Sequence, residues 1–84
     1  GIELQSPSTL NKLDYCHVKY GGSTGGRGAN IYMFGSSNGS YLSLSNSYVG
    51  DSQTYGIYRA SGSTTLNTSS VTYANNSSGD IYEE

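Results

Sequence analysis

The sequence predicts an all-β fold in which short parallel strands stack in about three rungs, as in a solenoid. One observation is an Ile-Tyr dipeptide that recurs with glycine or small polar neighbours, in ANIYMFGS, YGIYRASGS and GDIYEE. Its isoleucines, Ile31, Ile57 and Ile81, are 26 and 24 residues apart, and such a period is typical of solenoids. The other observation is a composition rich in turn residues and poor in helix-forming ones.

The composition favours one small domain of strands and polar turns. The 84 residues are 33% hydrophobic and include nine tyrosines and a single proline. Disordered chains, in contrast, are usually depleted in aromatic residues and enriched in charge. A formal net charge of −2 with four Lys and Arg residues gives no electrostatic footprint for nucleic acid or an anionic membrane. No apolar run is long enough to span a bilayer.

Strand-like segments alternate with turn clusters along the whole chain. The predicted strands are 13–20, 30–34, 41–48, 56–59, 70–73 and 80–82. Clusters of Gly, Ser, Thr and Asn between them predict turns. Each rung is therefore expected to hold an apolar strand, a turn, a short Ile-Tyr strand and a second turn. The rungs cover approximately 2–30, 31–56 and 57–82.

Stacking of equivalent strands predicts ladders of like side chains. An inward ladder, the stacking core, is expected to consist of Ile2, Ile31, Ile57 and Ile81. Because side chains alternate along a strand, the next residue of each strand should point outward. That alternation predicts an outward ladder of Tyr32, Tyr58 and Tyr82.

The longer strands are aligned by their tyrosines. We place Tyr20, Tyr48 and Tyr73 at one level, and this register makes two further levels. One contains Leu13, Tyr41 and Leu66, and the other contains Val18, Asn46 and Val71. The differences in rung length then fall in the turns, where insertions are tolerated.

Three segments carry a resemblance to a known family. KLDYCHVKYGGSTGGRGANIYM, LSLSNSYVGDSQTYGIY and VTYANNSSGDIY resemble rungs of the right-handed parallel β-helix proteins of the pectate-lyase-like superfamily. The opening GIELQSPSTLNKLDYCHVKYGG is similar to a segment of secreted or cell-surface bacterial members. The resemblance implies a right-handed parallel β-helix at an extracellular or cell-surface location. It implies no single activity, since this architecture hosts lyases, hydrolases, adhesins and inert spacers.

Position 59 departs from the apolar inward pattern that Met33 sets. Arg59 stands there, and Glu83 has the equivalent place in the next rung. The two side chains are predicted to form an ion pair across one rung. Near a solvent-exposed corner, such a pair contributes under about 1 kcal/mol.

The end rungs are predicted to be uncapped. GIEL opens the chain on a rung, without an initiator Met, and the chain stops soon after GDIY. An uncapped solenoid exposes unpaired strand edges and apolar side chains. We therefore expect either a part of a longer solenoid or identical chains that stack end to end. Stacking of the second kind does not close and yields a filament.

The acidic residues and the histidine do not predict catalysis. In this register Asp14, Asp51 and Asp80 fall on three different faces or corners, so no carboxylate cluster is expected. His17, the single histidine, should have no acidic residue placed to orient its ring. Cys16, the single cysteine, excludes an internal disulfide and is interpreted as a small core side chain. No cofactor or metal is expected.

In the same register His17 is expected to be level with Ser45 and Ser70. A Ser-His arrangement across rungs would still lack an acidic partner. The sequence thus predicts a structural solenoid segment that is not an enzyme and whose partners are further rungs or identical subunits. The alternative is a carbohydrate-binding module, or a non-catalytic fragment of a polysaccharide lyase or hydrolase. In that alternative the outward tyrosine ladder would contact the sugar.

Overall fold

The computed structural model describes residues 1–22, 28–35 and 39–84. Within these ranges the chain forms ten β-strands and no helix, so the described segments include none that could cross a membrane as a helix. The strands are β1 (Ile2–Leu4), β2 (Lys12–Asp14), β3 (His17–Lys19), β4 (Ala29–Met33), β5 (Ser40–Ser45), β6 (Tyr48–Gly50), β7 (Tyr55–Arg59), β8 (Thr64–Ser69), β9 (Thr72–Ala74) and β10 (Gly79–Glu83).

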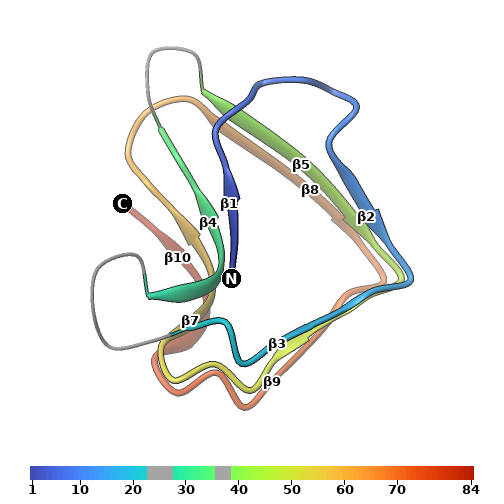
Figure 1. Cartoon of the computed structure of the whole chain (residues 1–84), viewed down its shortest axis with the longest axis vertical. Helices are drawn as coiled ribbons and strands as arrows, with labels where there is room; N and C mark the ends of the chain where they lie inside the picture. Colours follow the sequence, from blue (N-terminus) through green and yellow to red (C-terminus); the bar gives the residue numbers. More distant parts are fainter. Residues whose placement is uncertain (23–27, 36–38) are drawn as a thin grey trace.

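The strands form three parallel sheets that the chain visits in a fixed order. Sheet A has the strand order β1-β4-β7-β10, sheet B the order β2-β5-β8 and sheet C the order β3-β6-β9. Viewed down the shortest axis, the strands of each sheet overlie one another and the three sheets outline a triangle (Figure 1). Every circuit of the chain adds one strand to each sheet. This arrangement is compatible with the predicted parallel β-helix.

The pairing in sheet A confirms the predicted register of the Ile-Tyr strands. Ile2 pairs with Ile31, Ile31 with Ile57, and Ile57 with Ile81. One residue along, Tyr32, Tyr58 and Tyr82 are level, with Glu3 in the first strand at the same level. The recurring Ile-Tyr dipeptide, extended backwards to Ile2, therefore located four strands of one sheet.

The register predicted for the other two sheets is wrong. Leu13 is level with Leu44 and Thr68, so it is not level with Tyr41 and Leu66. Similarly, Val18 is level with Val49 and Tyr73, and Asn46 and Val71 belong to other levels. Tyr20, Tyr48 and Tyr73 occupy three different positions, because Tyr48 begins β6 opposite Thr72 and Tyr20 follows β3.

Two of the predicted strands are each divided by a corner, and one strand was not predicted. Segment 13–20 divides into β2 and β3, and segment 41–48 into β5 and β6. The polar segment Thr64–Ser69, which lies outside the predicted strands, forms β8 because it pairs with β5 along its whole length. Its Leu66 faces the interior opposite Leu42.

Single residues in the left-handed conformation make the corners on both sides of sheet C. Between sheets B and C they are Tyr15, Asn46 and Ser70, with φ of 54°, 49° and 54°. After sheet C they are Tyr20, Asp51 and Asn75, with φ of 57°, 56° and 57°. Each set follows three residues that pair across the sheet, so the corners are stacked as well. One residue of this conformation turns the chain sharply, so that β3 begins only three residues after β2 ends.

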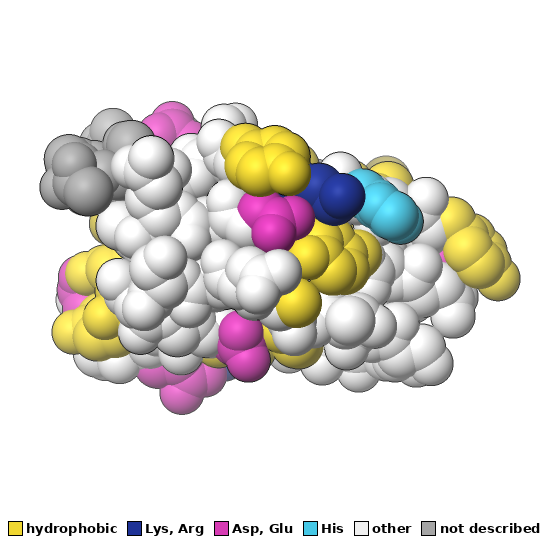
Figure 2. All heavy atoms as spheres, turned by 90° about the horizontal axis from the view of Figure 1, so that it is seen from below, with side chains coloured by type: hydrophobic (Ala, Val, Ile, Leu, Met, Phe, Trp, Pro, Cys, Tyr) yellow, Lys and Arg dark blue, Asp and Glu magenta, His cyan; other side chains and the backbone are white. Residues whose placement is uncertain are grey.

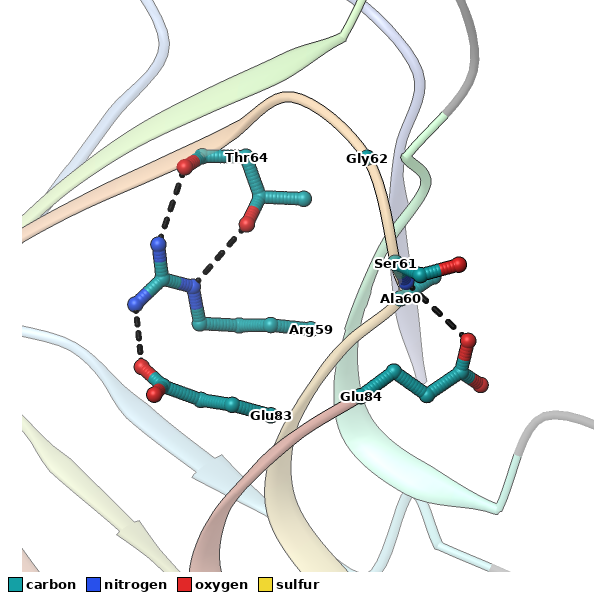
Figure 3. Close-up of a pocket in the computed structure, with 7 residues that line it drawn as sticks. All are labelled: Arg59, Ala60, Ser61, Gly62, Thr64, Glu83 and Glu84. Carbon is teal, nitrogen blue, oxygen red and sulfur yellow. Dashed lines mark hydrogen bonds and ion pairs between the residues drawn. The ribbon is translucent and has the colours of Figure 1, made fainter.

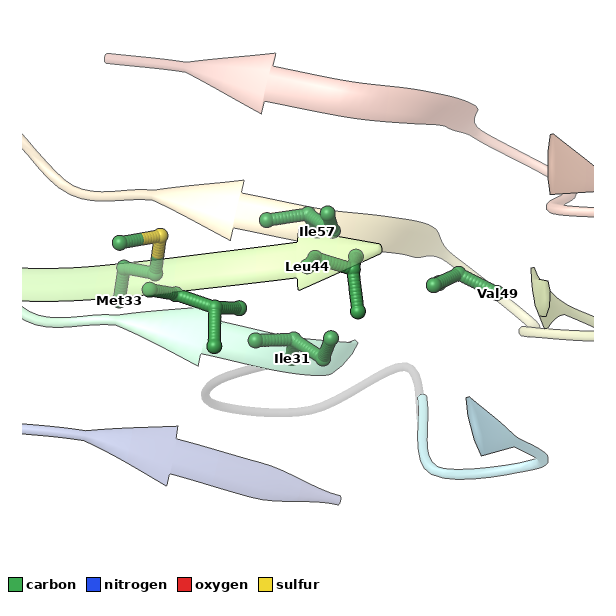
Figure 4. Close-up of a cluster of buried hydrophobic side chains, with 6 residues drawn as sticks. Ile31, Met33, Leu44, Val49 and Ile57 are labelled. Carbon is green, nitrogen blue, oxygen red and sulfur yellow. The ribbon is translucent and has the colours of Figure 1, made fainter. Parts of the chain in front are cut away.

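The hydrophobic core lies in the middle layers of the stack. Its buried members among the described residues are Ile31, Met33, Leu42, Leu44, Val49 and Ile57 (Figure 4). Aliphatic side chains of the first layer, such as Ile2 and Leu13, are only partly buried against this cluster. Ile81, in the last strand, is 40% exposed although it belongs to the same ladder. Burial is therefore complete only where a layer has neighbours on both sides.

Candidate functional site

The aromatic ladder on the outer face of sheet A, which consists of Tyr32, Tyr58 and Tyr82, was predicted as a contact surface. The centroids of Tyr32 and Tyr58 are 4.9 Å apart with an interplanar angle of 11°, and those of Tyr58 and Tyr82 are 4.8 Å apart with an angle of 30°. Tyr55 and Phe34 pack on the flanks of the ladder with tilted or edge contacts. The parallel pairing of β4, β7 and β10 imposes this spacing.

This packing limits what the aromatic ladder can bind. The ring of Tyr58 lies between those of Tyr32 and Tyr82, so both of its faces are occupied by neighbouring rings. A sugar that stacks on an aromatic face needs that face free. Tyr82, which is 37% exposed, ends the ladder in the last strand of sheet A. The rings of the aromatic ladder therefore cover each other, and Tyr58 offers no free ring face to a sugar.

A carboxylate holds the middle of the aromatic ladder. The Tyr58 hydroxyl donates to Oε2 of Glu84, whose Oε1 accepts from the backbone N of Ser61 at 3.0 Å. The bond to the Glu84 carboxylate, assisted by desolvation, raises the pKa of Tyr58 to about 12. The same bond lowers the pKa of Glu84. The sequence carries no signal for this contact, since the two residues are 26 positions apart and share no recurring motif.

Arg59 and Glu83 form the predicted ion pair, at the rim of a polar hollow (Figure 3). The guanidinium of Arg59 also donates through Nε to Thr64 Oγ1 at 3.1 Å and through Nη2 to the Thr64 carbonyl at 2.9 Å. The hollow of about 220 Å³ is lined by Arg59, Ala60, Ser61, Gly62, Thr64, Glu83 and Glu84. It marks the passage from sheet A to sheet B in the last circuit.

A second, apolar hollow opens at the other end of the stack. Its volume is about 240 Å³, and it is lined by Ile2, Leu4, Leu10, Asn11, Lys12, Leu13 and Leu42. Leu10, in the turn between β1 and β2, is 81% exposed. The hollow is the open end of the space between sheets A and B. Together with the unpaired edges of β1, β2 and β3, it makes the first layer an incomplete surface.

The aspartates predicted to be apart are apart, and each is hydrogen bonded near a turn. Asp14 accepts from Ser45 Oγ at 2.9 Å and from Asn46 Nδ2 at 3.1 Å. Asp51 accepts from Tyr48 Oη and Asn75 Nδ2, both at 3.2 Å. Desolvation raises the pKa of Tyr48, and the nearby Asp51 carboxylate raises it further.

Asp80 accepts from Asn76 Nδ2 at 3.2 Å. All three aspartates therefore bind turn or strand side chains of this chain. In the part of the chain that the structure describes, no three His, Cys, Asp or Glu side chains gather as metal ligands would.

His17 lies on the outer face of sheet C, at a different level from the predicted one. It is level with Tyr48 and Thr72, and not with Ser45 and Ser70. Its ring is 5.5 Å from that of Tyr48, over which Lys19 Nζ also lies, at 5.2 Å from the centroid. Figure 2 shows this face, with the histidine and a basic side chain beside hydrophobic side chains. The packing explains the position of His17 as a cross-strand contact.

Cys16 lies between β2 and β3, outside the buried cluster. Its side chain is half-buried, and Sγ donates to the carbonyl of Asp14 at 3.3 Å. It is therefore a corner residue, and the interpretation as a core side chain is wrong in this respect. The corner interrupts the strand that the sequence predicted to run through this position.

No protein-family model matches this chain, and no curated protein or solved structure is significantly similar to it. The features that a function has to explain are the aromatic ladder, the two hollows and the incomplete end layers.

Proposed function

We propose that the chain is a structural segment of a right-handed parallel β-helix, whose end layers dock further rungs. Those rungs belong to the same polypeptide or to identical subunits, which would then form a filament. The resemblance to the pectate-lyase-like superfamily and the three parallel sheets support this fold. The same resemblance supports a secreted or cell-surface location, and the separation of the three aspartates supports a role other than catalysis.

The incomplete end layers are the observation that carries the proposal. Among the described residues, each sheet ends in a strand with a neighbour on one side only. These strands are β1, β2 and β3 at one end and β10, β8 and β9 at the other. These edges present unpaired backbone donors and acceptors that another strand can pair with. The same isoleucine ladder is fully buried at Ile31 and Ile57 and exposed at Ile81. A further layer would therefore bury apolar surface and pair backbone groups in one step.

Association of the purified chain tests the proposal. We expect sedimentation at micromolar concentration to show species larger than a monomer, and electron microscopy to show elongated particles. Leu13→Lys, which puts a charge in the apolar hollow, should reduce association. Tyr15→Lys is the matched control, because Tyr15 is 78% exposed at a corner. A sharp monomer that unfolds cooperatively would contradict the need for further rungs.

A second candidate function, carbohydrate binding, is favoured by one end of the aromatic ladder. The exposed ring of Tyr82 ends the ladder, and the polar hollow beside the neighbouring Glu83 offers several hydrogen-bonding groups. A ring with adjacent polar groups suits a sugar. The chain would then be a carbohydrate-binding module, or a non-catalytic fragment of a polysaccharide lyase or hydrolase.

Retention on polysaccharide gels distinguishes carbohydrate binding from the docking of further rungs. Tyr82→Ala should abolish retention, and Tyr58→Ser should weaken it by removing the ring that supports Tyr82. Tyr15→Ala, outside the aromatic ladder, should leave it unchanged. Equal mobility of the parent chain with and without a panel of neutral and acidic polysaccharides would contradict carbohydrate binding and leave stacking as the function.

A further inference from the structure

One column of inward positions in sheet A changes its chemistry along the stack. Its residues are Leu4, Met33, Arg59 and Glu83, which are level in β1, β4, β7 and β10. The first two are aliphatic, and Met33 is fully buried. The last two are the ion pair beside the polar hollow. The two ends of the stack are therefore chemically different at equivalent positions.

The ion pair is anchored on one side and open on the other. Arg59 is held in place, since its side chain is only 22% exposed and donates twice to Thr64. Glu83 is 64% exposed, and the next layer would lie on the side of β10 away from β7. An aliphatic side chain placed there would take water from the carboxylate without giving it a partner. A lysine or arginine would give it a second opposite charge.

We infer that the rung which docks on β10 places a lysine or arginine level with Glu83, so that the column continues as alternating charges. This inference rests on the proposed function and names the partner's chemistry. The partner is a parallel β-rung that carries a basic residue at this inward position.

An identical copy of this chain does not fit that description. Head-to-tail stacking in the observed register would place Ile2, Glu3 and Leu4 level with Ile81, Tyr82 and Glu83. Only the isoleucines match. Leu4 would cover the Glu83 carboxylate, and Glu3 would replace an aromatic partner for Tyr82. Self-association of the purified chain through these layers is therefore expected to be weaker than docking of a rung that carries the basic residue.

An added rung tests the inference directly. A copy of residues 61–84 fused after Glu84 continues the circuit in phase, because Ala60 and Glu84 follow the paired residues Arg59 and Glu83. The position of this copy that lies level with Glu83 is made Lys, Leu or Glu. We expect the Lys chain to have a folding equilibrium constant about fivefold larger than the Leu chain, from urea unfolding, and the Glu chain to have the smallest.

A double-mutant cycle with Glu83→Leu is the control for this experiment. In the Glu83→Leu background, a leucine in the added rung should become more stable than a lysine, so the order reverses. A folded added rung in which leucine equals or exceeds lysine above Glu83 overturns this inference alone. Removal of the added rung by protease in all versions, with the parent's stability unchanged, overturns the proposed docking function together with it.

Discussion

Asn30 is fully buried, although its side-chain amide carries a hydrogen-bond acceptor, Oδ1, and a donor, Nδ2. Its Oδ1 accepts from the backbone N of Gly21 at 2.7 Å and of Gly22 at 3.2 Å. Its Nδ2 donates to the carbonyls of Val18 at 3.1 Å and Gly50 at 2.7 Å. Gly21 and Gly22 follow β3 where the chain leaves sheet C for sheet A, and Val18 and Gly50 belong to strands of sheet C. One amide therefore satisfies four backbone groups of two adjacent layers.

Replacement of Asn30 by Ala should cost about 3 kcal/mol of unfolding free energy, because it leaves buried backbone groups without partners. Urea unfolding followed by circular dichroism measures the loss. The matched control is Asn67→Ala, which removes an exposed hydrogen bond to Tyr41 and should change stability by less than about 0.5 kcal/mol. Equal losses for the two variants would show that the corner amide has no special role.

In the next layer, the equivalent corner is filled by an asparagine from another position in the sequence, Asn76. Asn76 accepts from the backbone N of Ser52 and donates to the Val49 carbonyl, at 3.3 Å and 3.2 Å. Gly56, level with Asp80, leaves the room for it, since a Cβ there would lie 3.0 Å from Asn76 Nδ2. Asn76 therefore bonds to backbone groups at this corner. Asn30, which follows GGRGA in the sequence, carried no signal that separated it from a strand residue.

The left-handed corners give a second prediction for single residues. Tyr15 has φ of 54° and is 78% exposed, so its ring gains little from packing while its backbone is strained. Asn tolerates this conformation and already occupies it at position 46. Tyr15→Asn should therefore raise the unfolding free energy by about 1 kcal/mol. In the opposite direction, Asn46→Val should destabilise the fold, and thermal melts of both variants check the pair.

At the level of elements, the sequence located one sheet and misplaced two. The Ile-Tyr strands of sheet A are bounded by turns, so an alternating pattern within each strand was enough to align them. Strands β2 and β3 are joined through the left-handed corner at Tyr15, and β5 and β6 through the corner at Asn46. A left-handed residue breaks the alternation of inward and outward side chains. Patterns on either side of a corner therefore cannot be aligned as one strand.

Residue identity was also a poor guide in those sheets. Tyr20 forms a corner, Tyr48 points outward beside His17, and Tyr73 packs against the core. A tyrosine suits all three environments because its ring is apolar and its hydroxyl is polar. The spacing of Leu44 and Val49, equal to that of Leu13 and Val18, was the better signal. The Arg59–Glu83 pair, predicted from sheet A alone, was right because that register was right.

The Tyr58–Glu84 contact makes the stability of sheet A dependent on pH. Hydrogen bonding to the Glu84 carboxylate raises the pKa of Tyr58 from 10.0 to about 12. A phenol that holds its proton more tightly in the folded state stabilises the fold below pH 10, and this contribution disappears as the pH rises from 10 to about 12. The urea midpoint should therefore fall over that range. A phenolate absorbance titration should show phenols that ionise late, with Tyr58 among them.

Two phenylalanine variants isolate this contact. Tyr58→Phe removes the phenol bonded to Glu84 and should reduce the fall of the urea midpoint between pH 10 and 12. Tyr15→Phe removes an exposed phenol outside the aromatic ladder and should leave the fall in place. At the acidic end, the lowered pKa of Glu84 gives stability that is lost as the pH falls below 4.5. An unchanged profile in Tyr58→Phe would show that other groups cause the dependence.

At the scale of the whole molecule, burial follows the position of a layer in the stack. The molecule measures 31 × 28 × 16 Å, and the layers stack along its shortest dimension (Figure 1). Ile31 and Ile57 have a layer on either side and no exposed surface, whereas Ile2 and Ile81 begin and end the ladder. The isoleucines of this ladder thus occupy both core and edge environments. Stability should be concentrated in the middle layers.

Truncation of this ladder measures that gradient. Ile57→Ala should cost about 3 to 4 kcal/mol, because it leaves a cavity in a fully packed layer. Ile81→Ala should cost about 1 kcal/mol or less, since the side chain is 40% exposed and its surroundings are already open to water. If a further rung docks on β10, its presence should raise the cost at Ile81 toward that at Ile57. Equal costs in the isolated chain would mean that its last layer is already covered, for instance by self-association, and dilution of the sample during the unfolding measurement distinguishes that case.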